Sequence, residues 1–87
     1  MKCLQLMIDG KVENTGFRFY VYRSAITLGI KGSVKVQNGR VIIEAEGEDA
    51  PLNRFGELCR KGPEGSRVEK MQSIEMDLTG YEEFRIL

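Results

Sequence analysis

Two hydrophobic periods alternate along this chain in a fixed order, and that order limits the possible folds more than any other feature. Residues 3–8, 34–45 and 67–78 carry apolar side chains at every second position, which is typical of half-buried strands. Two intervening segments carry them three or four positions apart, which places them on one face of a helix. With a short apolar stretch at 84–87, the predicted order is strand, helix, two strands, helix, strand and a short last strand.

Turn residues indicate where the strands end. The pair Asp9-Gly10 is expected to close the first strand. Asn38-Gly39 is the strongest short-range signal for a hairpin, and it separates the next two strands. The order of elements is that of the ferredoxin-like βαββαβ sandwich, an α+β fold with an antiparallel sheet and two helices on one face. A chain of 87 residues is expected to form one domain, residues 1–87.

Capping residues predict where the two helices begin and end. The first helix is expected to begin at Phe17 and to end at Gly29 or Gly32, because glycine commonly follows the last residue of a helix. Asp49 is the expected N-cap of the second helix, which should end at Gly62.

The charged residues predict a solvated sheet face and a neutral molecule. Glu44 and Glu46 alternate with apolar residues and are expected to face solvent from the helix-free side of the sheet. Lys and Arg number 13, as do Asp and Glu, so the net charge is zero. A neutral total gives no support for nucleic-acid binding, and the hairpin strands lack the aromatic side chains that stack on bases.

The absence of histidine restricts the chemistry. It removes Ser-His and Cys-His nucleophile pairs and His-containing metal sites. Cys3 and Cys59 match no metal or redox spacing, so we expect two free thiols and no metal or cofactor. We expect a cytoplasmic monomer with no membrane partner, since the N-terminus has no signal-peptide pattern and no apolar run approaches the ~20 residues of a membrane span.

The loop at residues 10–18 is the unusual local feature. It leads from a strand into a helix, so its backbone N–H groups and the helix dipole favour an anion there. Arg18 falls in the first helical turn, where a cation opposes the dipole by roughly 0.3–1 kcal/mol. Its guanidinium suits forked contact with a phosphate or carboxylate. The alternative is that Arg18 points to solvent and the loop is a plain turn.

The same loop carries a family resemblance. Its sequence GKVENTGFR (10–18) resembles the acylphosphatase signature G-x-V-Q-G-V-G-F-R. LGIKGSV (28–34), NGRV (38–41) and GPEGSRV (62–68) resemble later motifs of that family, as does FRI (84–86), in the family's order and spacing.

The resemblance implies hydrolysis of small acyl phosphates to a carboxylate and inorganic phosphate, without a metal or organic cofactor. It assigns phosphoryl binding to Arg18 and to the loop amides. That loop is made up of Glu13, Asn14, Thr15, Gly16, Phe17 and Arg18. The family's water-orienting Asn falls on Val36, which has no group able to orient a water. Asn38 is a possible substitute, at about 6.6 Å along an extended strand, and Asn14 is a second.

Glu13 also departs from the family pattern, which has Gln there. A carboxylate 4 Å from a bound anion repels it by about 1 kcal/mol in water and about 4 kcal/mol at an effective dielectric of 20. Glu13 could instead pair with Arg18, or point outward and do neither. Three functions stay open: a hydrolase of reduced activity, an inactive module that binds a phosphate, a carboxylate or a protein partner, and a purely structural domain.

Overall fold

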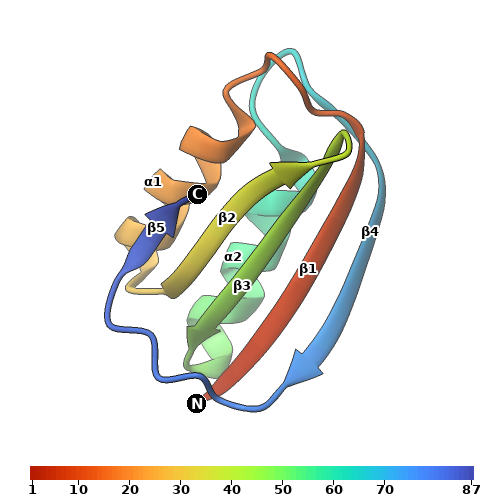
Figure 1. Cartoon of the computed structure of the whole chain (residues 1–87). Helices are drawn as coiled ribbons and strands as arrows, with labels where there is room; N and C mark the ends of the chain where they lie inside the picture. Colours follow the sequence, from red (N-terminus) through yellow and green to blue (C-terminus); the bar gives the residue numbers. More distant parts are fainter.

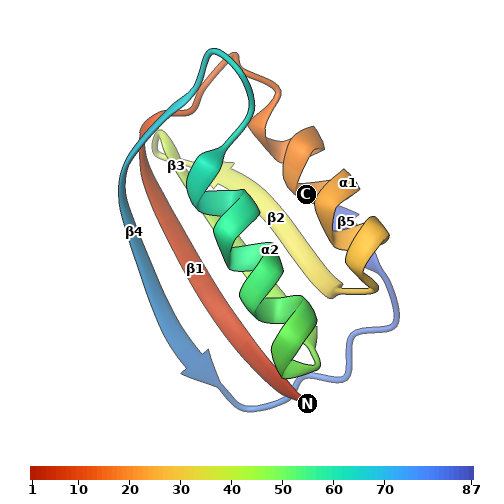
Figure 2. The same ribbon diagram turned by 180° about the vertical axis from the view of Figure 1, so that it is seen from behind.

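A five-stranded sheet forms one layer of the molecule and two helices form the other (Figure 1). The computed structural model describes all residues from 1 to 87. The elements are β1 (Lys2–Lys11), α1 (Phe17–Leu28), β2 (Lys31–Gln37), β3 (Arg40–Gly47), α2 (Asp49–Lys61), β4 (Arg67–Met76) and β5 (Phe84–Ile86). Both helices cover the same face of the sheet, as seen from behind (Figure 2). This is the ferredoxin-like α+β fold that the sequence predicts.

The sheet order is β4-β1-β3-β2-β5, and its last pairing differs from the expectation. The first four strands pair antiparallel, but β5 runs parallel to β2. The sheet is therefore mixed rather than antiparallel. β5 reaches this edge because the chain after β4 crosses the end of the sheet before turning back along β2 (Figure 1).

β1 extends beyond the predicted end at Asp9-Gly10. The strand continues to Lys11 because its register with β4 shifts between Asp9 and Gly10, leaving Glu69 as the extra residue of a bulge. Gly10 has φ 141°, and a Cβ there would lie 2.1 Å from the Arg67 carbonyl oxygen. Glycine is thus a bulge residue here and not a strand terminator.

The hairpin and the first helix form as predicted, and the second helix begins differently. Asn38 and Gly39, with φ of 55° and 74°, form the two-residue turn between β2 and β3. Gly29 caps α1 in the left-handed conformation. The N-cap of α2 is Glu48, with no side-chain hydrogen bond, so Asp49 is the first helical residue and not the cap.

The core lies between the two layers, and one carboxylate is buried outside it. Fifteen buried apolar residues form the core, drawn from both helices, from four of the strands and from the two connections that flank α1. The prediction that Glu46 faces solvent is wrong, because the crossing segment between β4 and β5 covers it and leaves it 4% exposed. Its carboxylate accepts hydrogen bonds from the backbone N–H groups of Thr79, Gly80 and Tyr81.

Candidate active site

The loop between β1 and α1 is held in one shape by its two ends and one internal hydrogen bond. Val12 and Phe17 are each 2% exposed and anchor the loop in the core. The Thr15 hydroxyl donates to the Val12 carbonyl oxygen at 2.6 Å. Asn14 and Gly16 have φ of 60° and 75°, the left-handed values that let neighbouring N–H groups turn to one side. The sequence folds this way because Gly and Asn adopt that conformation most readily.

The backbone N–H groups of residues 13–19 donate to no acceptor within the protein. Gly16 is the N-cap of α1 and offers no side-chain acceptor, and the first turn contains no acidic residue. The positive end of the helix is therefore uncompensated by the protein's own groups. Such a terminus is suited to bind an anion.

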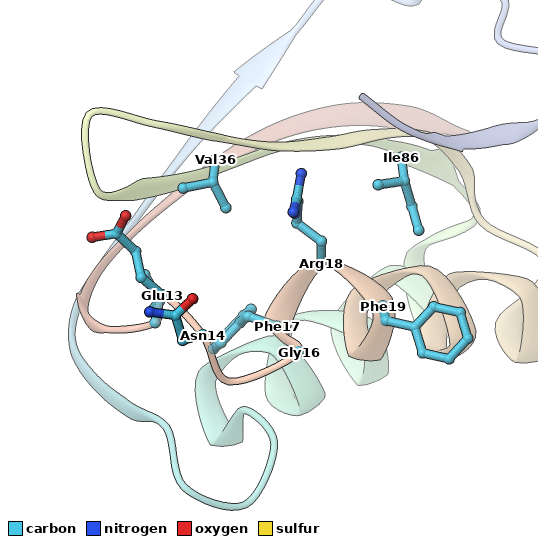
Figure 3. Close-up of a pocket in the computed structure, with 9 residues that line it drawn as sticks. Glu13, Asn14, Gly16, Phe17, Arg18, Phe19, Val36 and Ile86 are labelled. Atoms are coloured by element: carbon cyan, nitrogen blue, oxygen red, sulfur yellow. The ribbon is translucent and has the colours of Figure 1, made fainter.

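These amides border a cavity of about 400 Å³ beside Arg18. Figure 3 shows Arg18 rising from the first turn of α1 between Val36 of β2 and Ile86 of β5. The nine lining residues are Val12, Glu13, Asn14, Gly16, Phe17, Arg18, Phe19, Val36 and Ile86. The structure thus brings the predicted loop residues together with Val36, except for Thr15, which does not line the cavity and whose hydroxyl donates to the Val12 carbonyl oxygen.

Glu13 and Arg18 do not pair. Arg18 takes part in none of the five salt bridges of the molecule, and neither does Glu13. The Glu13 side chain points away from Arg18 (Figure 3), and its Oε1 lies 3.5 Å from where a Cβ on Gly39 would be. The guanidinium therefore keeps its hydrogen-bond donors for a ligand.

Asn38 lies away from this cavity, while Val36 lines it. Asn38 sits in the hairpin turn and borders a separate hollow together with Asp9 and Arg40, which form an ion pair at 2.8 Å. Val36 faces the cavity with two methyl groups and no donor or acceptor. The wall above Arg18 is therefore apolar where the family pattern has an amide.

Two cavity residues, Phe19 and Ile86, were missed by the sequence reasoning. Phe19 is 60% exposed and Ile86 is 41% exposed. An apolar residue one position beyond Arg18, on the polar side of the helix, was the available signal for Phe19. Nothing in the local sequence places Ile86 here, because its position follows from the parallel pairing of β5 with β2.

The titratable groups with displaced pKa values lie outside the cavity. Burial raises the pKa of the Cys59 thiol to about 12, and it also raises that of Cys3, so neither is a thiolate nucleophile at neutral pH. Burial raises the pKa of Tyr20, whose hydroxyl donates to the Leu58 carbonyl at 2.8 Å.

No group of three or more Cys, Asp or Glu side chains is arranged to hold a metal ion. Neither helix has the length and apolar character needed to cross a bilayer.

Fold and cavity together define a small α+β domain whose strand-to-helix loop has free backbone N–H groups and whose cavity contains one arginine outside any salt bridge. The family model for acylphosphatase matches residues 4–86. The acylphosphatase of Thermotoga maritima is 39% identical over 87 residues, covering 99% of this chain and 97% of the relative. The crystal structure of the acylphosphatase from Bacillus subtilis superposes with a TM-score of 0.97 at 34% identity, covering 100% of this chain and 99% of that one.

A larger protein contains a similar unit. HypF, solved in a phosphate- and nucleotide-bound form, matches with a TM-score of 0.90 at 28% identity, covering 99% of this chain but 12% of that one. The chain described here belongs to the acylphosphatase family. It is an acylphosphatase-like hydrolase, from a family that acts on small acyl phosphates.

Proposed function

We propose that this protein hydrolyses small acyl phosphates to a carboxylate and inorganic phosphate at a reduced rate, with the phosphoryl group bound by the amides of residues 13–18 and by the Arg18 guanidinium. One observation carries the proposal: these N–H groups have no acceptor in the protein, and they border the same cavity as an unpaired Arg. Donors fixed before the substrate arrives stabilise developing negative charge without reorganisation.

The reaction needs little from titratable side chains. A water oxygen attacks phosphorus, the bond from phosphorus to the carboxyl oxygen breaks, and the electron pair leaves with the carboxylate. Carboxylic acids have a pKa near 4, so the leaving carboxylate needs no proton at neutral pH. The water gives up its proton as inorganic phosphate forms. A chain without histidine can therefore support the reaction through positioning and electrostatic stabilisation.

The reduced rate follows from Val36. Arg18 and the loop hold the phosphoryl group, but the wall facing it from β2 offers no hydrogen bond to the attacking water. Asn38 lines a different hollow, and Asn14 belongs to the loop that binds the phosphoryl group. The water is then placed by the substrate and solvent alone.

A phosphate titration followed by NMR, combined with a turnover assay, tests the proposal. Inorganic phosphate should shift the amide resonances of residues 13–19 and should inhibit turnover of acetyl phosphate, measured above the enzyme-free rate. Amide shifts spread evenly over the surface, or turnover no faster than buffer, would contradict it.

Substitution of Val36 tests the explanation of the rate. Val36→Asn should raise kcat by about tenfold, since one well-placed hydrogen bond worth about 1.4 kcal/mol corresponds to that factor. Val36→Leu is the matched control, which adds bulk without an amide and should not raise kcat. If Val36→Asn is no faster than the wild type, the missing amide is not the limiting defect.

The second candidate function is an inactive module that binds an anion or a protein partner. The aliphatic wall at Val36 favours it, because phosphate binding needs only the loop and Arg18. The related unit within HypF supports the idea that such domains serve inside larger proteins. Amide shifts with phosphate, together with no turnover by wild type or by Val36→Asn, would favour this function.

We further propose that the chain acts as a single domain and a cytoplasmic monomer, without a cofactor and without nucleic-acid or membrane partners. Two free cysteines suit a reducing compartment, and equal numbers of acidic and basic residues give no net positive charge to attract a polyanion. Sedimentation at micromolar concentration checks the monomer, which a mass of 9.9 kDa would identify.

A further inference from the structure

The cavity is larger than a phosphoryl group requires, and its far side is apolar. A volume of about 400 Å³ lies within the range of 300–1,000 Å³ that accommodates whole small ligands. Figure 3 shows Glu13 and Asn14 on one side of Arg18 and Phe19 and Ile86 on the other. The charged end of a ligand and its apolar end would therefore meet different walls.

Phe19 is held in place although most of its surface is exposed. Its ring stacks on Tyr22, with centroids 6.4 Å apart and planes 12° from parallel. Tyr22 in turn contacts Phe84 of β5 at 6.4 Å. This row of rings ties the first turn of α1 to the strand that carries Ile86, so the two exposed side chains form one preorganised edge.

Ile86 is fixed by the sheet. It pairs with Val34 of β2, and the Leu87 N–H donates to the Val34 carbonyl oxygen at 2.9 Å. Val36 lies two residues further along β2 and so on the same face as Val34. Ile86 and Val36 thus continue one apolar wall past Arg18.

On these grounds we propose that Phe19 and Ile86 bind the acyl group and make the protein select acyl phosphates with a bulky apolar acyl group, aromatic or branched, over those with a small one. This inference rests on the proposed hydrolysis. The two side chains determine specificity and take no part in the chemical step, because they carry no polar atom and adjoin the cavity on the side away from the loop.

The acyl preference is measured as the ratio of kcat/KM for benzoyl phosphate to that for acetyl phosphate. Wild type should favour benzoyl phosphate. Phe19→Ala and Ile86→Ala should each lower the ratio by about five- to tenfold, near the lower limit for loss of a hydrophobic contact in a binding pocket. In both variants kcat/KM should fall less for acetyl phosphate, whose methyl group has little surface to contact, than for benzoyl phosphate. Ile26→Ala is the matched control, since Ile26 is 55% exposed on the same helix but does not line the cavity.

An unchanged ratio in both Phe19→Ala and Ile86→Ala would overturn the inference, whether the kcat/KM values for the two substrates stay as in wild type or fall by the same factor. A measurement of binding alone distinguishes failure of this inference from failure of the proposed hydrolysis. Benzoylphosphonate and acetylphosphonate, in which a carbon–phosphorus bond replaces the scissile one, are titrated into the same variants by calorimetry. If wild type shows no turnover, the proposed hydrolysis is wrong. The ratio of the Kd values for the two phosphonates, compared between wild type and the variants, still decides whether Phe19 and Ile86 bind the acyl group.

Discussion

Two loops of this molecule present consecutive backbone N–H groups, and only one of them has an acceptor within the protein. In the segment that crosses from β4 to β5, the N–H groups of Thr79, Gly80 and Tyr81 all donate to the Glu46 carboxylate. In the loop before α1, those of residues 13–19 donate to nothing in the chain. Both loops have a glycine in the left-handed conformation, with φ of 83° at Gly80 and 75° at Gly16.

The difference shows that consecutive backbone N–H groups stabilise the fold where a carboxylate of the protein accepts from them, and stay available to a ligand where none does. Glu46 fills the first loop with the protein's own anion and so fastens the crossing segment to β3. Burial acts to raise the pKa of Glu46, but hydrogen bonds from the amides of Thr79, Tyr81 and Gly80 and from the Cys3 thiol outweigh it, and the net pKa is lowered. The loop before α1 has no such carboxylate, and Glu13 points away from it. Its donors stay without an acceptor in the protein, and in the proposed function they bind the phosphoryl group of a substrate.

The largest effect is expected where the free loop meets its single cation. Arg18→Ala should lower kcat/KM by about 100- to 1,000-fold, the usual loss when one donor to transition-state charge is removed. Stability should stay the same or rise by about 0.3–1 kcal/mol, because a cation in the first turn of α1 opposes the helix dipole.

Steady-state kinetics and urea unfolding together check this prediction. Arg18→Lys is the control for charge alone, and it should recover part of the rate but not the forked contact. A variant Arg18→Ala that kept wild-type kcat/KM would remove the guanidinium from the site.

Removal of the internal anion should affect stability and leave binding intact. At neutral pH Glu46→Gln should lower the free energy of unfolding, since an amide cannot accept from three N–H groups as a carboxylate does. Glu44→Gln is the matched control on the same strand, where the carboxylate accepts only from the Tyr81 hydroxyl, and it should cost less. Phosphate affinity should be unchanged in both.

The pH dependence of unfolding tests whether the ionised Glu46 carboxylate stabilises the fold. Because the pKa is lowered in the folded state, the carboxylate stabilises the fold at pH above its usual range, and that contribution is lost as the pH falls through this range toward the lowered value. The stability gap between wild type and Glu46→Gln should therefore shrink in acid. A gap that stayed constant from pH 7 to about pH 3 would show that Glu46 acts through packing alone.

These two loops also mark how far the sequence alone could lead. Local patterns predicted the element order, the Asn38-Gly39 hairpin and the end of α1 at Gly29, because each depends on residues close together in the chain. The loop before α1 was likewise found from its own residues. The cavity then brings together Arg18 and Val36, which the resemblance to the family had singled out.

The features that the sequence did not predict depend on contacts between segments that are far apart in the chain. Glu46 has the alternating pattern of a solvated strand face, and only the segment that arrives more than thirty residues later buries it. The bulge that carries β1 past Gly10 needs β4 as its partner. The position of Ile86 beside Arg18 follows from a parallel pairing that no local period encodes.

A pair of glycine substitutions gives the smallest expected effect and the most direct test of the comparison. Gly16 and Gly80 both have positive φ, and a Cβ on either would meet nothing within 4 Å. Gly16→Ala and Gly80→Ala should therefore each cost about 1–2 kcal/mol, the price of a left-handed conformation for a residue with a Cβ. In the crossing segment Glu46 holds the backbone in place, so the whole cost of Gly80→Ala should appear in the free energy of unfolding.

In the loop before α1 no internal anion opposes relaxation, so Gly16→Ala can turn its backbone to a less strained conformation. Phosphate must then restore the original one, and part of the cost should appear as a Kd raised by up to about tenfold, the factor that about 1.4 kcal/mol represents. Calorimetric titration of both variants with phosphate, alongside urea unfolding, separates the two cases. Equal phosphate affinity in Gly16→Ala and Gly80→Ala would mean that the loop before α1 is held as firmly without an anion as the crossing segment is with Glu46. The proposed difference between the two loops would then be wrong.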